Sequence, residues 1–248
     1  MANDGFRNED EIVSVLNGKR YKEINSNMKK FLKTIFQIAP KSNDIIICNK
    51  IAGTEKTDIF IKINDETHYI SIKKGSGNSV HQEPVEEFIN YLKEKFNISK
   101  DIAEDIRFFI WGDNTLDGKG DLKNRLSANQ LKKMFPEKIK NINNFFDLYK
   151  QELITRFLIE GSECAVDPDY IYYGTAEEGV GISMVDAVEW LIETNKNVKS
   201  ITIGKLTFQA WNRNINGGTK SENKRGQIQV KWGSIGKDTT KIWENKYG

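Results

Sequence analysis

The chain has 248 residues, of which 38% are hydrophobic and 29% charged, and its formal net charge at pH 7 is +2. This balance is typical of a soluble globular protein. It excludes a uniformly basic surface, so binding of nucleic acid would require basic and acidic residues to lie apart. With only His68 and His81, the sequence nearly excludes zinc hydrolases with three-histidine sites and nucleases with histidine-rich motifs.

Nothing in the sequence predicts a membrane span or a disulfide framework. No run approaches the roughly 18 apolar residues needed to cross a bilayer. The amino terminus has no apolar signal-peptide core, so we expect a cytoplasmic protein. Cys48 and Cys164 are expected to be reduced, buried thiols, because two cysteines are too few for a zinc cluster or a disulfide framework.

Apolar spacing predicts two helices and a buried strand in the first 50 residues, over 9–16, 26–38 and 45–48. Glu9 lies on the apolar stripe of the first helix, together with Phe6, Ile12, Val13 and Leu16. Two interpretations of Glu9 stay open. It is either an acid that favours the positive end of the helix dipole or a functional carboxylate.

The stretch 57–74 predicts two short strands joined by a turn, and we expect the rest of the chain to be organised around this hairpin. Asp58 opens the first strand, and Ser71 and Lys73 lie near the end of the second. Residues two apart on a strand share a face, so Ser71 and Lys73 point to one side and Ile72 to the other. A hairpin of this length can bring Asp58 beside Ser71 and Lys73.

These residue types suit metal-dependent hydrolysis of a phosphodiester. The Asp58 carboxylate and the backbone carbonyl of Ile72 can bind Mg²⁺, which positions a water and neutralises phosphate charge. Lys73 can hold the attacking water or stabilise the transition state. The alternative is an exposed hairpin with ordinary surface residues, because an Asp followed by Ser-x-Lys occurs often by chance.

The second half of the chain predicts an α+β fold in one domain, with no repeat or linker. A glycine- and serine-rich loop at 75–83 follows the hairpin, and Pro84 starts a helix. Further helices are predicted over 101–110, 127–134, 137–160 and 185–194, with a loop at 112–125. Strands are predicted over 169–174, 200–211 and 226–232, the last two separated by a polar, glycine-rich segment.

The order of these motifs resembles the PD-(D/E)xK nuclease core, in which a helix with a glutamate precedes a hairpin carrying Asp and (Asp/Glu)-x-Lys. Gly5-Phe-Arg-Asn-Glu9 is similar to the helix motif, Thr57-Asp58 to the first strand and Ser71-Ile-Lys73 to the second. Two departures stand out. Thr57 replaces the proline, and Ser71 replaces the second acid and so removes one expected metal ligand. The resemblance implies a central mixed sheet flanked by helices.

A neutral residue before x-Lys also resembles the small type II restriction endonucleases of the MspI-like kind, which cut GC-rich four-base palindromes. Loose counterparts extend over most of the chain, at 4–9, 156–161, 204–209 and 229–231. Other restriction enzymes with Ser-x-Lys take the second carboxylate from the following helix. Glu83, Glu86 and Glu87 are the candidates here, with Glu87 at the closest spacing, although Glu86 and Glu87 also fit a solvated helix face.

Polar and basic residues near the end of the chain are candidates for reading base edges, which Arg, Lys, Gln and Asn contact through paired hydrogen bonds. Gln227, Gln229 and Lys231 share one face of a predicted strand. The remaining candidates of this region are Gln209, Trp211, Asn212, Arg213, Lys220, Asn223, Lys224 and Arg225. The glycine-rich loop after the hairpin adds Lys74, His81 and Gln82. A solvated loop between surface strands is the alternative.

The resemblance implies a Mg²⁺-dependent type II restriction endonuclease that cleaves double-stranded DNA at a short, palindromic sequence. Asp58 would bind the metal with Ile72 and Glu87, Lys73 would assist the water, and Ser71 and Glu9 would be auxiliary. The implied partners are duplex DNA and a cognate methyltransferase, and the enzyme would act as a monomer or dimer. Residues 1–248 would form one domain, with a core at about 1–110 and recognition elements at about 75–84 and 200–235. The alternatives are a nuclease of the same core with little sequence preference and a DNA-binding module whose site has decayed.

Overall fold

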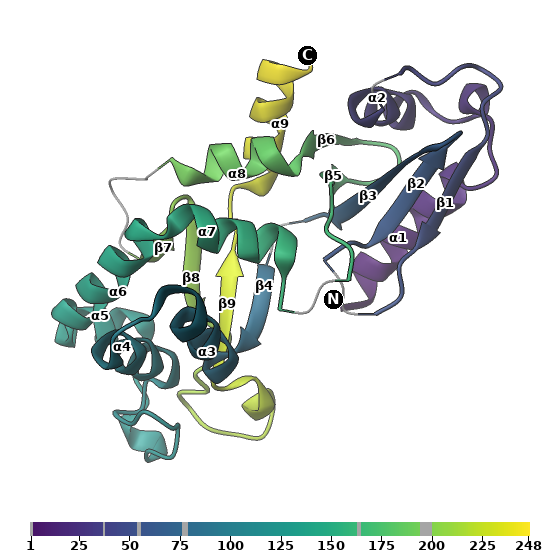
Figure 1. Cartoon of the computed structure of the whole chain (residues 1–248). Coiled ribbons are helices and arrows are strands. Elements are labelled where there is room, and N and C mark those ends of the chain that lie inside the picture. Colours follow the sequence, from purple (N-terminus) through teal and green to yellow (C-terminus); the bar gives the residue numbers. More distant parts are fainter. Residues whose placement is uncertain (1, 37, 54–55, 76–78, 163–164, 194–199) are drawn as a thin grey trace. The chain divides into compact units, whose positions relative to one another are not determined.

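The structure, a computed structural model, describes residues 2–36, 38–53, 56–75, 79–162, 165–193 and 200–248 (Figure 1). The chain divides into two compact units. The first comprises Met1–Asn78, Thr155–Leu191 and Gly233–Gly248, and the second comprises Ser79–Ile154 and Ile192–Trp232. Two compact units can belong to one folding domain, so the single-domain expectation stays a prediction.

The first unit contains a five-stranded mixed sheet in the order β1-β2-β3-β5-β6. Strands β3 and β5 are parallel, and every other neighbouring pair is antiparallel. The strands are β1 (Ile46–Lys50), β2 (Ile59–Ile63), β3 (Glu66–Lys73), β5 (Tyr170–Gly174) and β6 (Gly179–Ser183). The helices are α1 (Ala2–Leu16), α2 (Ser26–Ile35), α8 (Met184–Ile192) and α9 (Ile235–Lys246).

Helices α1 and α2 cover one face of this sheet because both present an apolar stripe to it. Ile12 and Leu16 of α1, with Phe31 of α2, are at most 2% exposed and share a core with the strands. The strands contribute alternate residues, including Ile59 and Ile70, which are fully buried. Alternation then directs Ser71 and Lys73 of β3 away from this core. The predicted mixed sheet flanked by helices is confirmed.

Helix α9 and strand β6 were not predicted from the sequence. The ring of Tyr173, on β5, lies against the backbone of Gly236 at the start of α9, where a Cβ atom would meet the ring at 2.7 Å. The Trp243 indole donates to Thr34 Oγ1 at 3.1 Å and stacks under the Lys30 ammonium. Helix α9 is therefore tied to elements that are far from it in sequence.

The second unit contains an antiparallel four-stranded sheet in the order β4-β9-β8-β7. Its strands are β4 (Ser79–Pro84), β7 (Ile201–Ile203), β8 (Leu206–Ala210) and β9 (Gln227–Lys231). Its helices are α3 (Val85–Phe96), α4 (Lys100–Trp111), α5 (Ala128–Met134), α6 (Pro136–Leu148) and α7 (Lys150–Thr155).

Three predictions for this part of the chain were wrong. The single strand predicted over 200–211 is two strands, β7 and β8, which pair antiparallel across a short turn. The described residues at 79–83 form strand β4 rather than a loop, because they pair with β9 near the end of the chain. The single helix predicted over 137–160 is three segments, of which the last is a π-helix over Arg156–Glu160. Ser127 caps α5 as predicted, accepting from the backbone of Gln130.

An aromatic core lies between the second sheet and its helices. The ring of Phe208, on β8, is 4.9 Å from that of Phe146 and 5.7 Å from that of Phe88, centre to centre. Phe109 of α4 stacks at 6.3 Å. Each of these rings is at most 2% exposed, and aromatic pairs at such distances add stabilisation beyond their buried area. One face of the sheet is thereby committed to the core, which leaves its other face to the polar residues.

A buried ion pair joins the loop at 112–125 to the segment before β9. Arg225 Nη2 lies 3.1 Å from Asp113 Oδ2, and both side chains are at most 4% exposed. Asp113 also accepts from Thr115, at 2.7 Å from its hydroxyl, and from the backbone of Gly120 at 3.2 Å. The Asp113 carboxylate therefore both holds the loop at 112–125 and neutralises the buried Arg225 guanidinium.

We expect Asp113→Ala to lower the free energy of unfolding by about 3–5 kcal/mol, because it leaves the buried Arg225 guanidinium with only the more distant and partly exposed Glu222 carboxylate, at 3.7 Å. Chemical denaturation monitored by tryptophan fluorescence measures this change. Asp117→Ala removes an exposed carboxylate from the same loop and should leave the denaturation midpoint unchanged. Equal midpoints for the two variants would contradict the structural role of Asp113.

Candidate active site

The backbone on both sides of Asp58 is held by the sheet. The Asp58 amide donates to the carbonyl of Ile70 on β3 at 2.9 Å. The Asp58 carbonyl accepts from the amide of Ile51, just after β1, at 3.0 Å. Asp58 is thus fixed between β1 and β3 at the point where β2 begins, and its side chain has a defined direction.

The side chains of Asp58, Ser71 and Lys73 converge as the sequence predicts. The Lys73 ammonium lies 3.2 Å from Asp58 Oδ2, 2.8 Å from Ser71 Oγ and 2.9 Å from the Ile72 carbonyl oxygen. Asp58 Oδ2 also accepts from the Ile72 amide at 2.5 Å and from the Ser71 hydroxyl at 3.3 Å. The Lys73 ammonium is therefore contacted by three oxygen atoms, one from Asp58 just before β2 and two from β3.

Glu9, on α1, belongs to the same group of charges. Its side chain is 13% exposed and lies 3.0 Å from the Lys50 ammonium. Burial raises the pKa of Glu9 above its ordinary value, the hydrogen bond from Lys50 opposes this, and the negative charge of Asp58 raises the pKa further. The positive charge of Lys73 lowers the pKa of Glu9. Burial and the Asp58 charge therefore leave the pKa of Glu9 raised despite its ion pair with Lys50, and the functional role of Glu9 stays a prediction.

Lys50 was not predicted from the sequence. It is the last residue of β1, and its ammonium also lies 3.1 Å from Asp10 Oδ1. No local motif marks this lysine, because its partners are 40 and 41 residues away in the sequence. A strand-end position near the start of the hairpin is the only signal that could have drawn attention to it.

Thr57, which stands where the PD-(D/E)xK pattern has proline, is 1% exposed. Its hydroxyl donates to the carbonyl of Val166 at 2.6 Å. Nearby, Lys56 Nζ donates to the carbonyl of Phe157 at 2.8 Å, within the π-helix. This departure from the pattern therefore gives the start of β2 an anchor to the segment that leads into β5.

The donor set fits a hard divalent cation such as Mg²⁺. Asp58, Glu9 and the Ile72 carbonyl offer oxygen atoms, and Mg²⁺ keeps several waters, so it needs few protein ligands. Among the described residues, no group of three or more His, Cys, Asp or Glu side chains could hold a metal. Glu87 is an exposed residue of α3 in the second unit, so its role as a ligand stays a prediction.

Three glutamines form a row across the second sheet. Gln229 of β9 pairs with Gln82 of β4 on one side and with Gln209 of β8 on the other. Gln209 Nε2 donates to Gln229 Oε1 at 2.8 Å, and Gln82 Nε2 donates to Ser79 Oγ at 2.9 Å. In the neighbouring row, Lys231 lies between Ser79 and Thr207. The polar face of this sheet is defined by Ser79, Gln82, Thr207, Gln209, Gln227, Gln229 and Lys231.

The structure buries two other candidates for contact with bases, His81 and Arg225, and half-buries a third, Arg213. His81 is 4% exposed and its Nε2 lies 2.7 Å from the buried carboxylate of Glu83. Arg213 donates to the carbonyl of Phe109, and burial lowers its pKa to about 10. Arg225 pairs with Asp113, as described above. These side chains bond within the second unit, which corrects the expectation that they lie free on its surface. Gln229, in the row of glutamines, is also only 6% exposed, and Lys74 is half-buried.

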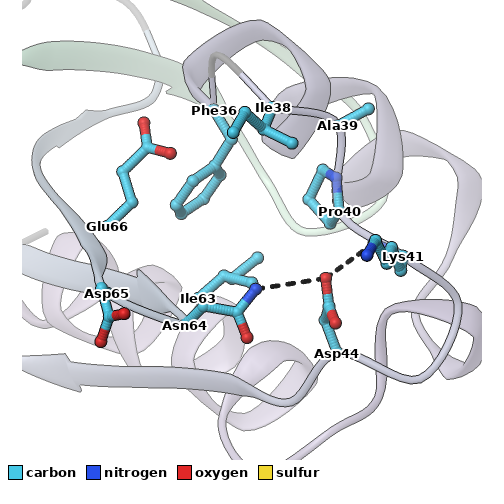
Figure 2. A pocket seen from close by; sticks show the side chains of 10 residues that line it. All are labelled: Phe36, Ile38, Ala39, Pro40, Lys41, Asp44, Ile63, Asn64, Asp65 and Glu66. Carbon is cyan, nitrogen blue, oxygen red and sulfur yellow. Dashed lines mark hydrogen bonds between the residues drawn. The ribbon is translucent and has the colours of Figure 1, made fainter.

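A shallow hollow of about 340 Å³ lies at the other end of the β2–β3 hairpin from Asp58 (Figure 2). Phe36, Pro40 and Ile63 line its apolar part, and Asp44 and Glu66 line its polar part. It contains none of the predicted site residues. The hollow and the charged group at the start of β2 are therefore separate features of the first unit.

No protein-family model matches the sequence, and no curated protein matches it. Among solved structures, the chain is similar to the crystal structure of restriction endonuclease MspI in complex with its cognate DNA. The sequence identity is 15%, the match covers 75% of this chain and 70% of that chain, and the TM-score is 0.49.

No helix among the described residues is both long enough and apolar enough to cross a membrane. Cys48 is buried as predicted, and Cys164 lies outside the described residues.

We expect Glu9→Gln to raise the melting temperature at pH 7.5. Because burial raises the pKa of Glu9 above its ordinary value of 4.5, the protonated form favours the folded state. That stability is fully present below about pH 4.5 and is lost as the pH rises through the raised pKa, so a neutral glutamine should retain it. Thermal unfolding at pH 4 and 7.5 measures the difference, which should vanish at the lower pH.

Glu11→Gln is the matched control, since Glu11 lies on the same helix and is 48% exposed. It should not reproduce the stabilisation at pH 7.5. A lower melting temperature for Glu9→Gln at that pH would mean that the ion pair with Lys50 outweighs the cost of burial.

Proposed function

We propose that this protein is a Mg²⁺-dependent endonuclease that cleaves double-stranded DNA at a short specific sequence, as type II restriction endonucleases do. The observation that carries the proposal is the convergence of Asp58, Ser71 and Lys73 at the end of a hairpin, with Glu9 acting on Asp58 from α1. Carboxylates and an ammonium in this arrangement suit phosphodiester hydrolysis.

In this proposal, Asp58, Glu9 and the Ile72 carbonyl hold Mg²⁺. The bound ion supplies Lewis-acid stabilisation of phosphate charge and a more acidic water. Lys73, whose ammonium contacts Asp58 and the Ile72 carbonyl in the structure, would donate to the attacking water or to a phosphate oxygen. Ser71 Oγ, which accepts from Lys73 at 2.8 Å, keeps that ammonium close to the reacting group. Hydrolysis at this site would leave 5′-phosphate and 3′-hydroxyl ends.

The distribution of charge supports DNA as the substrate. The second unit has 20 basic and 15 acidic residues, a formal charge of +5, whereas the first has 17 basic and 20 acidic residues, a formal charge of −3. A nearly neutral chain therefore concentrates positive charge in the unit that carries the polar face. The first unit holds the carboxylates that a metal would neutralise.

The polar face is the proposed surface for reading base edges. Glutamine amides offer a donor and an acceptor together, and lysine can donate to guanine in the major groove. The bond from Gln209 to Gln229 fixes the orientation of one amide before DNA arrives, which lowers the entropy cost of a contact. Phosphate contacts from the loops of this unit would add affinity that is independent of sequence.

The experiment is incubation of the purified protein with unmethylated plasmid and Mg²⁺, because a cognate methyltransferase would protect host DNA. Discrete fragments that are absent with EDTA support the proposal. A smear would instead indicate a nuclease of the same chemistry with little sequence preference. Binding without cleavage would indicate a DNA-binding module whose site has decayed.

A further inference from the structure

Lys50 connects two consecutive carboxylates of α1 to the end of β1. Its ammonium lies 3.0 Å from Glu9 Oε2 and 3.1 Å from Asp10 Oδ1, and the ring of Phe6 lies 5.2 Å away. The Lys50 side chain is 33% exposed, that of Glu9 13% and that of Asp10 65%. Of the two carboxylates that contact Lys50, Glu9 is therefore the more buried.

The strand that carries Lys50 also runs beside Asp58. Lys50 pairs with Ile59 across β1 and β2, and Ile51 donates its amide to the carbonyl of Asp58. The charges of Asp58 and Lys73 act on Glu9, so the ion pair of Lys50 with Glu9 lies within electrostatic range of that of Lys73 with Asp58. Each of the two carboxylates at the site has its own lysine.

We propose that Lys50 is a positioning residue that holds the Glu9 carboxylate in the orientation needed at the metal-dependent site. This role rests on the proposed nuclease function. Replacing a residue that orients a metal-binding carboxylate typically lowers metal affinity or activity about 10–100-fold. Lys50 acts through Glu9 and makes no contact with the reacting atoms.

Three variants test this role: Lys50→Met, which removes the charge, Lys50→Arg, which keeps the charge, and Glu9→Gln. We expect Lys50→Met to lower the single-turnover cleavage rate about 10–100-fold and Lys50→Arg to restore most of it. The double variant Lys50→Met/Glu9→Gln should be no slower than Glu9→Gln alone, because residues that act as a unit are not additive. Calorimetric titration with Mn²⁺, which involves no cleavage, should show that Lys50→Met and Glu9→Gln bind the ion more weakly than the parent and that Lys50→Arg binds it nearly as well.

DNA binding in Ca²⁺ distinguishes the proposed role from a direct contact between Lys50 and a phosphate. The proposed role leaves the affinity of Lys50→Met within about twofold of the parent, because a positioning residue does not touch DNA. Weaker binding, or effects that add to those of Glu9→Gln, would overturn it, as would wild-type cleavage and Mn²⁺ affinity in Lys50→Met. If the parent protein cleaves no DNA, the proposed nuclease function is wrong. If the parent is active and Lys50→Met is equally active, only the role of Lys50 is wrong.

Discussion

Asp58→Asn is expected to lower the single-turnover rate of Mg²⁺-dependent DNA cleavage by at least about a thousandfold. Lewis-acid stabilisation by a bound metal supplies several kcal/mol, and each 1.36 kcal/mol corresponds to a factor of ten in rate. Asparagine has the same shape and can still accept from the Ile72 amide, which Asp58 does at 2.5 Å. The fold should therefore survive while the negative charge at the metal position is lost.

Asp65→Asn is the matched control for this variant. Asp65 lies in the turn between β2 and β3, at the other end of the hairpin, and is exposed. Its replacement should leave the cleavage rate unchanged. Full cleavage by Asp58→Asn, at the same Mg²⁺ concentration as the parent, would exclude Asp58 as a metal ligand.

Lys73→Met is expected to lower the same rate by about 10²–10³, the usual cost of removing one group that stabilises charge in a transition state. Methionine keeps much of the length of the side chain but removes the ammonium that contacts Asp58, Ser71 and the Ile72 carbonyl. Affinity for DNA in Ca²⁺, measured without cleavage, should change little, because the ammonium acts on the water and the reacting phosphate.

Lys62→Met provides the comparison for Lys73→Met. Lys62 is a partly exposed residue of β2 on the same hairpin, and it pairs with Thr67 rather than with the charged group. Its cleavage rate should match that of the parent. If Lys73→Met lost affinity for DNA in proportion to its loss of rate, Lys73 would be a binding residue and the proposed chemistry would be wrong.

The central group could be predicted from the sequence because the interactions that build it are mostly local. Alternation on β3 places Ser71 and Lys73 on one face, and the short turn of the hairpin returns β3 to Asp58. Helical spacing likewise predicted the stripe on α1 that carries Glu9. Neither pattern contains Lys50, whose position beside Glu9 depends on the packing of α1 against β1.

The correction at Arg213 and Arg225 has a different cause. Both residues lie in a polar, glycine-rich segment, where arginine is ordinarily exposed. Arg225 is buried and Arg213 half-buried because the segment packs onto Asp113 and onto α4, which are about 100 residues earlier in the chain. The pairing of β4 with β9 was missed for the same reason: glycine and serine at 75–79 obscured a strand whose partner lies near the end of the chain.

The most direct measurement of the central claim is the anomalous scattering of Mn²⁺ in crystals of the protein, since Mn²⁺ favours the same oxygen ligands as Mg²⁺. The proposed site predicts a peak bonded to the Asp58 carboxylate and the Ile72 carbonyl, with the Lys73 ammonium displaced from both. A protein in which Mn²⁺ binds elsewhere, and Lys73 still contacts Asp58 and Ile72, would contradict a metal-dependent site at this hairpin.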